Sequence, residues 1–326
     1  MKLRVAVVYG GRSGEHEVSL RSAKSVMEAL DPQRYVVLPH LISKEGKWSP
    51  KPIQPEPRAN AHIDVVFPVL HGTFGEDGTL QGLCELADLP YVGPGVFASA
   101  ASMDKEAMKL LCRAQGLPVV EYVTLRPPFS STLEACKQLP FPMFVKPANL
   151  GSSVGISKVH NEQELRRAID LAAQFDRKVI VERAIVGREL ECGVLGNGDP
   201  VASLPSEIIP SREFYDYEDK YVLDKAQCLV PASLPDELTQ QVRRLAIQAY
   251  QAVQGEGMAR VDFLLETATS RLYISEINTI PGFTSISMFP KMWEHAGLPL
   301  PKLVDRLIEL ALERHEAKQK LRYSFG

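Results

Sequence analysis

The chain has 326 residues, of which 45% are hydrophobic and 24% charged, as in an ordinary globular protein of two or three domains. Its formal net charge of -3 gives no general attraction to nucleic acid or to an anionic membrane, so neither is expected as a partner. No apolar run reaches the length of a membrane span, and the N-terminus lacks the apolar core of a signal peptide.

The five cysteines are scattered along the chain, without the paired C-x-x-C spacing of zinc sites. This pattern favours buried thiols in a reducing compartment over disulfides, so we expect a cytoplasmic protein. The cysteines are Cys84, Cys112, Cys136, Cys192 and Cys228.

Residues 1–103 predict a parallel-sheet domain, because short apolar strands alternate with helices. Glu15 and His71 stand at strand ends, where open α/β sheets bind ligands. Two structural alternatives stay open: Glu15 can favour the helix N-terminus through the dipole, and a lone histidine is more often structural. The first glycine turn lacks the G-x-G-x-x-G fingerprint, which argues against a Rossmann dinucleotide site.

The next segment carries a second type of candidate site. A helix is predicted from Ser102, as its cap, to about Gly116. Further on, Lys146 ends a strand and is followed by the small-residue loop 151–155. Glycines and serines let backbone N–H groups approach phosphate oxygens closely, although a flexible hairpin turn would have the same composition. The loop is not a Walker P-loop.

Beyond residue 178 an apolar strand leads to two candidate nucleotide contacts. Ile185 could form a wall for adenine and Glu189 could accept from ribose hydroxyls, while the alternative for Glu189 is a surface acid on a strand. Residues 207–232 are long, aromatic and charged, and an ordered loop of that length is usually functional, often as a lid. Amphipathic helices are predicted over residues 234–254 and 300–320.

The segment 257–281 predicts an antiparallel hairpin, since two apolar runs flank a polar break. If it folds about residue 269, Asp262 lies opposite Glu276 and Arg260 lies opposite Asn278. Hard oxygen ligands of this kind suit Mg²⁺ that also binds substrate phosphates. The alternative is a solvated polar face on which Arg260 pairs the acids.

Seven ordered motifs, spanning nearly the whole chain, resemble the ATP-grasp enzymes and, more closely, the D-alanine–D-alanine ligase family. They are GGRSGEHEVSLRSA (10–23), LHGTFGEDGTLQG (70–82), SMDK (102–105), VKPANLGSSVGISKV (145–159), FYDYEDKY (214–221), GMARVDF (257–263) and EINTIPGFTSISMFPK (276–291).

The resemblance implies an α/β chain with α+β elements, namely an ATP-grasp fold with an N-terminal parallel-sheet domain. The expected domains are 1–103 for substrate binding, 104–186 as the small ATP-grasp domain, and 187–326 as the C-terminal ATP-grasp domain with the lid 207–232. It also suggests a homodimer formed through the N-terminal domain.

The resemblance implies an ATP site with two metal ions. Lys105, Lys146 and Ser153 would hold the phosphates, and Glu189 would take the ribose. The adenine would be framed by Glu182, Arg183 and Ile185. Two Mg²⁺ or Mn²⁺ ions would be ligated by Asp262, Glu276 and Asn278.

For the amino acid substrates, the resemblance implies that Glu15 holds the amine of a first D-alanine together with Ser152 and Tyr221. His71 would line the same subsite. The second subsite would involve Lys220, Ser287 and Met288. Arg260 and the N–H of Gly282 would stabilise the tetrahedral oxyanion.

The implied reaction is ATP-dependent ligation of two D-alanines through an acyl phosphate, for peptidoglycan precursor synthesis. Three alternatives remain: a depsipeptide ligase that uses D-lactate, a carboxylate–amine ligase for another substrate, and a non-catalytic ATP-binding module. The Lys220-Tyr221 pair favours the dipeptide-forming type.

Overall fold

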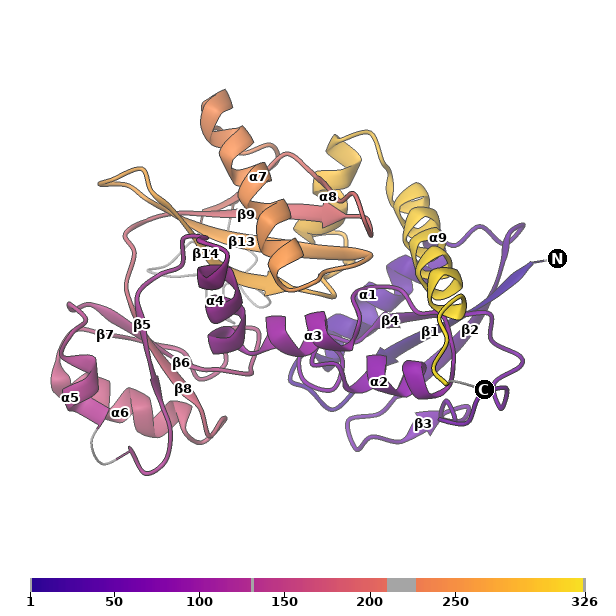
Figure 1. The fold of residues 1–326 in the computed structure, drawn as a ribbon, viewed down its shortest axis with the longest axis horizontal. Helices are drawn as coiled ribbons and strands as arrows, with labels where there is room; N and C mark the ends of the chain where they lie inside the picture. The colour runs from indigo at the N-terminus through magenta and orange to yellow at the C-terminus, as the bar shows by residue number, and fades with distance from the viewer. Residues whose placement is uncertain (1, 130–131, 210–226, 325–326) are drawn as a thin grey trace.

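The structure, a computed structural model, describes residues 2–129, 132–209 and 227–324. Figure 1 shows three separate sheets, with α3 (Val96–Met103) and α4 (Lys105–Ala114) running between the N-terminal part and the other two. Among the helices within these ranges, none combines the length and the apolar character that a membrane span requires.

The N-terminal sheet has the order β3-β2-β1-β4. Its three long strands are parallel, which confirms the predicted parallel sheet, and β3 adds an antiparallel edge. One further parallel bridge, between Val66 and Tyr91, extends this sheet. The elements are β1 (Leu3–Gly10), α1 (His16–Ala29), β2 (Tyr35–Ile42), β3 (Trp48–Ser49), β4 (Val65–Val69), α2 (Thr79–Leu86) and α3 (Val96–Met103).

The helix α4 (Lys105–Ala114) begins later than the sequence predicts. Asp104, not Ser102, is its N-cap, and its Oδ1 accepts hydrogen bonds from the backbone N–H groups of Glu106 and Ala107. Ser102 lies inside α3 instead. Aspartate and serine are equally good caps, so the preceding helix α3 decided the boundary.

The central sheet is antiparallel, with the order β5-β8-β6-β7 and helices α5 and α6 beside it. This arrangement places β8 and β6, which carry Glu182 and Lys146, next to each other in the middle of the sheet. The elements are β5 (Tyr122–Leu125), α5 (Thr132–Cys136), β6 (Met143–Pro147), β7 (Ser157–Val159), α6 (Glu162–Ala172) and β8 (Val179–Arg183).

The third sheet follows the path β12-β11-β9-β13-β14, and β10 pairs with β9. Within the expected lid, residues 207–209 and 227–229 form an antiparallel strand pair, and the segment between them lies outside the described residues. The elements are β9 (Gly187–Leu195), β10 (Val201–Ala202), β11 (Ser206–Ile209), β12 (Gln227–Leu229), α7 (Asp236–Ala252), β13 (Met258–Glu266), β14 (Leu272–Asn278) and α8 (Met288–His295).

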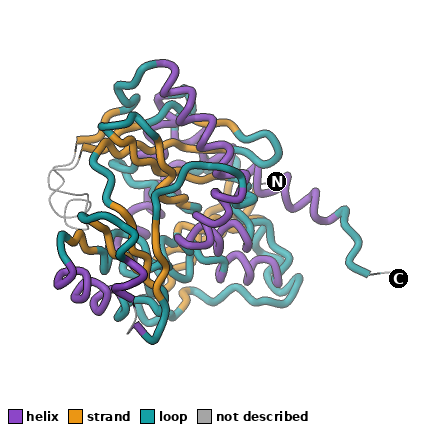
Figure 2. Tube along the Cα trace, turned by 60° about the vertical axis from the view of Figure 1, so that its left-hand side comes forward, coloured by secondary structure: helices purple, strands orange, loops and turns teal. Residues whose placement is uncertain are grey.

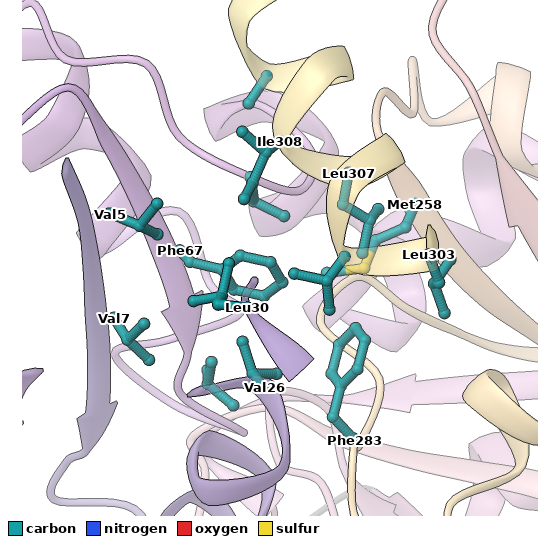
Figure 3. Packing of buried hydrophobic residues seen from close by; sticks show 14 of the residues in the cluster. Val5, Val7, Val26, Leu30, Phe67, Met258, Phe283, Leu303, Leu307 and Ile308 are labelled. Atoms are coloured by element: carbon teal, nitrogen blue, oxygen red, sulfur yellow. The ribbon is translucent and has the colours of Figure 1, made fainter. Parts of the chain in front are cut away.

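The last helix, α9 (Leu300–Gln319), shares its core with the N-terminal sheet. Figure 3 shows Leu303, Leu307 and Ile308 of α9 in the same cluster as Phe67 of β4 and Val5 of β1. Figure 2 shows the last described residues running outward from the end of α9. The two ends of the chain therefore contribute to one hydrophobic core, which also contains Met258 and Phe283.

Candidate active site

One cavity of about 530 Å³ is lined by residues of the central and third sheets, and by residues of α1 and of loops in the N-terminal domain. The candidate residues of the sequence analysis that line it are Glu15, His71, Lys146, Ser152, Ser153, Glu182, Arg183, Ile185, Glu189, Arg260, Asp262, Glu276, Asn278, Gly282, Ser287 and Met288. Lys105 is buried behind this wall, where its ammonium contacts Glu276. Lys220 and Tyr221 lie outside the described residues, so their placement stays a prediction.

The hairpin β13–β14 has the predicted register. Asp262 is paired with Glu276 and Arg260 with Asn278, on a ladder that also joins β13 to β9. Side chains alternate along β13, so Arg260, Asp262 and Leu264 line the cavity, while Ala259, Val261 and Leu265 are buried. A bulge leaves Ser275 without a partner, which lets Ile274 and Ile277 both reach the core while Glu276 faces the cavity.

Arg260 and Asp262 form a two-point ion pair at the floor of the cavity. The Nε and Nη2 atoms of Arg260 each donate to one oxygen of Asp262, at 2.7 Å. The Asn278 amide donates to the same carboxylate at 2.9 Å, and Glu191 lies 3.2 Å from Arg260. Burial opposes the charge on Arg260, but these carboxylates raise its pKa well above the ordinary value. Arg260 therefore remains a cation directed at the cavity.

Asp262, Glu276 and Asn278 together fit a magnesium or manganese ion that is shared with a nucleotide. No group of three His, Cys, Asp or Glu side chains suited to a metal occurs within the described ranges. The chain offers two opposed carboxylates and one amide at this place. Mg²⁺ commonly takes one or two carboxylates and completes its shell with phosphate oxygens and water, so this donor set fits when a nucleotide is bound.

Three charged residues meet at the other end of the cavity, and one of them is absent from the sequence-based predictions. Lys146 donates to Oε2 of Glu182 at 2.7 Å. The Nζ atom of Lys109 lies 2.9 Å from Oε1, as an ion pair rather than a directed hydrogen bond. Burial opposes ionisation of Glu182, but the two ammonium groups lower its pKa to about 2. Glu182 is therefore an ionised, acceptor-only group.

The side chain of the neighbouring Arg183 is paired with two carboxylates. Its guanidinium contacts Glu121, next to β5 of the same sheet, at 2.9 Å and Glu266 of β13 at 2.7 Å, which ties β8 to the third sheet. Its backbone N–H also donates, to the carbonyl oxygen of Glu121 at 3.1 Å. An aromatic wall that the sequence-based reasoning missed, Phe144 of β6, lines the same part of the cavity.

The small-residue loop approaches Glu15 of the N-terminal domain. Ser152 and Ser153 both have left-handed backbone conformations, with φ of 52° and 58°. The hydroxyl of Ser152 donates to Oε1 of Glu15 at 2.5 Å. Glu15 occupies the N-cap position of α1, yet its side chain makes no capping hydrogen bond. Gly72 has a φ of 72°, which favours glycine, and a Cβ there would lie 2.6 Å from Oε2 of Glu15 and displace this carboxylate.

His71 is held by the protein through both ring nitrogens. Nδ1 donates to the carbonyl oxygen of Ile280 at 2.9 Å, because a carbonyl can only accept. Nε2 therefore accepts from the hydroxyl of Ser22 at 3.0 Å, in agreement with burial, which lowers the pKa of His71 and keeps it neutral. The Ser22 oxygen accepts from the N–H of Phe283 at 3.1 Å. Thus Ser22 and His71 fix the turn that contains Gly282.

Glu76 reinforces the same turn, and the sequence-based predictions omitted it. Its two oxygens accept from the backbone N–H groups of Gly72, at 2.7 Å, and Ile280, at 3.0 Å. Burial, with a further contribution from the negative charge of Glu15, raises the pKa of Glu76 to about 8.

The segment after the turn carries the two remaining candidates. A Cβ on Gly282 would lie 2.7 Å from the hydroxyl oxygen of Ser287, so a larger residue would displace that hydroxyl. The Ser287 oxygen accepts from the N–H of Thr284 at 3.0 Å. Met288, the first residue of α8, packs against Ile208 and forms part of the cavity wall.

Comparison with known proteins connects this geometry with one family. The family model described as "D-ala D-ala ligase C-terminus" matches residues 111–309, and "D-ala D-ala ligase N-terminus" matches residues 4–60 and 51–94. A D-alanine–D-alanine ligase of Solibacter usitatus is 68% identical and covers 99% of this chain and 100% of its own length.

Solved structures agree over nearly the full length. The D-alanine–D-alanine ligase of Coxiella burnetii superposes with a TM-score of 0.87 at 40% identity, covering 98% of this chain and 96% of its own. VanG, a D-Ala:D-Ser ligase of Enterococcus faecalis, superposes with a TM-score of 0.86 at 34% identity, covering 95% of this chain and 100% of its own. The fold is the expected α/β ATP-grasp fold with an N-terminal parallel-sheet domain, and the chain belongs to the D-alanine–D-alanine ligase family.

Proposed function

We propose that this chain joins two D-alanines to D-alanyl-D-alanine at the expense of ATP, through an acyl phosphate, for peptidoglycan precursor synthesis. The observation that carries the proposal is the single cavity in which Arg260, the Asp262–Glu276 pair and Glu15 lie together. The family membership supports the reaction class, and the relative at 68% identity supports D-alanine as the second substrate.

The nucleotide end of the cavity has the charges that ATP needs. Lys105, Lys146 and Ser153 would bind the phosphates, because ammonium groups and loop N–H groups offset their negative charge. Ile185 and the acids Glu182 and Glu189 would contact the base and ribose. Two Mg²⁺ or Mn²⁺ ions, when bound at Asp262, Glu276 and Asn278, supply the charge that a phosphoryl transfer disperses.

The amino acid end has one anion and two oxyanion donors. The Glu15 carboxylate, oriented by Ser152, would bind the ammonium group of the first D-alanine. When the second amine attacks, the tetrahedral intermediate carries a negative oxygen, and Arg260 with the Gly282 N–H would stabilise it. Lys220 and Tyr221, together with Ser287 and Met288, remain proposed parts of the second subsite.

The second substrate separates this proposal from its competitors. The structural relative that is a D-Ala:D-Ser ligase makes D-serine an informative comparison, and D-lactate tests the depsipeptide alternative. We expect the purified chain to release phosphate from ATP with D-alanine, and to yield D-alanyl-D-alanine by mass spectrometry. L-alanine, D-serine and D-lactate should each give less product when paired with D-alanine.

The same assay defines failure. ATP binding without phosphate release would favour a non-catalytic nucleotide module. If D-serine or D-lactate gives more mixed product than D-alanine gives D-alanyl-D-alanine, that compound is the second substrate in place of D-alanine. Turnover only with another amine would point to a different carboxylate–amine ligase.

We further propose a cytoplasmic homodimer that pairs through the N-terminal domain. Three apolar side chains of α2 and α3 are exposed: Leu86 at 65%, Val96 at 41% and Phe97 at 49%. Burying such residues is the usual driving force for association. Sedimentation of the unsubstituted chain should give the mass of a dimer, and Leu86→Asp should shift it toward the monomer. A monomer at all concentrations would contradict the dimer.

A further inference from the structure

A second lysine of α4, Lys109, lies one helical turn after Lys105 on the same buried face. Its side chain is 0% exposed, and its ammonium lies 2.9 Å from Glu182. Within the described ranges, the ion pair with Glu182 is the one found for Lys109. Burying an ammonium group is costly unless a specific partner offsets the loss of water. For Lys109 that partner is the carboxylate of Glu182.

Glu182 is held at both oxygens by cations from two different elements. Lys109 of α4 contacts Oε1, and Lys146 of β6 contacts Oε2 at 2.7 Å. Two contacts fix the plane of the carboxylate and keep it ionised, as its depressed pKa also indicates. Each carboxylate oxygen has two lone pairs, so both can accept a further hydrogen bond from a ligand in the cavity.

The two lysines differ in their access to the cavity. Lys146 lines it, while Lys109 is not among the lining residues. Lys146 can therefore move toward a phosphate when a nucleotide binds, whereas Lys109 acts on a ligand only through Glu182. When Lys146 contacts the nucleotide phosphates, Lys109 is the cation that stays next to Glu182 and keeps it ionised.

We propose that Lys109 is a positioning residue that, through Glu182, makes the nucleotide pocket select a base with an amino group over one with an oxo group. This inference rests on the proposed ATP site. An ionised carboxylate accepts from the N–H of an amino group and repels the lone pairs of an oxo group. A protonated carboxyl can instead donate to the oxo group, so loss of Lys109 weakens or reverses the preference.

The test compares ATP with inosine triphosphate, which carries an oxo group where adenine carries its amine. In Lys109→Met, a side chain of similar length without charge, we expect the KM for ATP to rise about tenfold and kcat to change less than about twofold. The KM for inosine triphosphate should stay constant or fall. Lys109→Arg should restore most of the preference for ATP, because it restores the charge.

Two controls separate this role from a structural one. Lys302→Met makes the same substitution at an exposed lysine of α9 and should leave both KM values unchanged. The proposal would be overturned if the Lys109→Met variant melts cooperatively and still shows the original KM for ATP and the original preference for ATP over inosine triphosphate. If Lys109→Met does not fold, Lys109→Met/Glu182→Gln removes both charges, and full retention of the preference in that variant would overturn it.

Equilibrium binding distinguishes failure of this inference from failure of the proposed function. Calorimetric titration of the unsubstituted chain with ATP and with inosine triphosphate measures the base preference without turnover. A chain that prefers ATP in binding but lacks D-alanine-dependent turnover would contradict the ligase function alone. A chain with D-alanine-dependent turnover and equal affinity for both nucleotides would contradict the role of Lys109 alone.

Discussion

The hydroxyl of Ser152 donates a hydrogen bond of 2.5 Å to Glu15, and so joins the small-residue loop of the central sheet to the N-terminal domain. The bond spans 137 residues of sequence and closes one side of the cavity. It orients the acid proposed to bind the first D-alanine, and it comes from the loop proposed to bind phosphate. The two ends of the cavity are therefore linked through one serine.

Substituting Ser152 by alanine should weaken D-alanine binding more than ATP binding. Hydrogen bonds to charged groups contribute about 1.5–3 kcal/mol, so we expect the KM for the first D-alanine to rise about tenfold or more. The KM for ATP should change less than about twofold. Ser153→Ala, at the adjacent position, keeps the backbone N–H proposed to contact phosphate and should leave the KM for D-alanine unchanged, which makes it the matched control. Equal effects of the two variants on both substrates would contradict separate roles.

Replacing Glu276 by glutamine should remove activity and leave the fold intact. The side chain keeps its size but loses the charge proposed for the metal, and we expect turnover to fall at least about a hundredfold. Its partner Lys105 has a side chain that is only 7% exposed, so losing the ion pair should lower the free energy of unfolding by about 1–3 kcal/mol, while the Lys105 ammonium keeps its hydrogen bond to the carbonyl oxygen of Leu150.

Metal dependence provides the specific readout for this variant. After removal of divalent ions with a chelator, Glu276→Gln should require a higher Mg²⁺ concentration than the unsubstituted chain. Glu316→Gln, an equally conservative change at an exposed position of α9, is the matched control and should behave like the unsubstituted chain. Full activity of Glu276→Gln at low Mg²⁺ would remove this residue from the metal site.

Cys228 should report on nucleotide binding. It lies on β12, is exposed and lines the cavity, while the other four cysteines are buried. Burial raises the pKa of those thiols, for example to about 12 for Cys84 and about 11 for Cys112, which keeps them unreactive. We expect alkylation of the native chain to modify one thiol, and Mg²⁺ with ATP to slow that reaction several-fold.

The variant Cys228→Ser identifies the reactive position, since it should show no fast thiol reaction. In denaturant, the unsubstituted chain should expose all five cysteines. An alkylation rate that is identical with and without saturating nucleotide would argue against a nucleotide near β12.

Local periodicity allowed the sequence to predict the central features of the site. Alternation along β13, combined with the polar break, determined which residues of β14 face Arg260 and Asp262, and the pairing confirms this register. The bulge at Ser275 was not predictable, because it depends on Ile274 and Ile277 both fitting the core. Packing of this kind depends on the folded structure and produces no periodic pattern in the sequence.

Contacts between distant segments account for the residues that were missed. Glu76 and Ile280 are 204 residues apart, and Ser22 and Phe283 are 261 apart, so no local pattern connects them. The same reason explains α9, whose apolar face was visible in the sequence but whose partner, the N-terminal sheet, was not. Lys109 was missed because a single lysine on a helix is usually solvated.

The pH dependence of stability should contain a contribution from Glu76. Its pKa is about 8 in the folded chain, raised mainly by burial, whereas an unfolded glutamate titrates near its ordinary value of about 4.5. Between these pH values the folded chain binds more protons at this position than the unfolded chain. Raising the pH through this window should therefore lower the free energy of unfolding of the nucleotide-free chain.

The variant Glu76→Gln isolates this contribution, because glutamine cannot titrate but has nearly the same shape. The difference in the free energy of unfolding between the unsubstituted chain and the variant should change with a slope approaching about 1.4 kcal/mol per pH unit between pH 5 and 8. Its sign should favour the unsubstituted chain at the acidic end. Glutamine also places an N–H₂ group where Glu76 now accepts from Gly72 or Ile280, but this adds a constant offset and no slope. Urea unfolding at a series of pH values measures both curves, and parallel curves would show that Glu76 is ionised in the folded chain throughout this range.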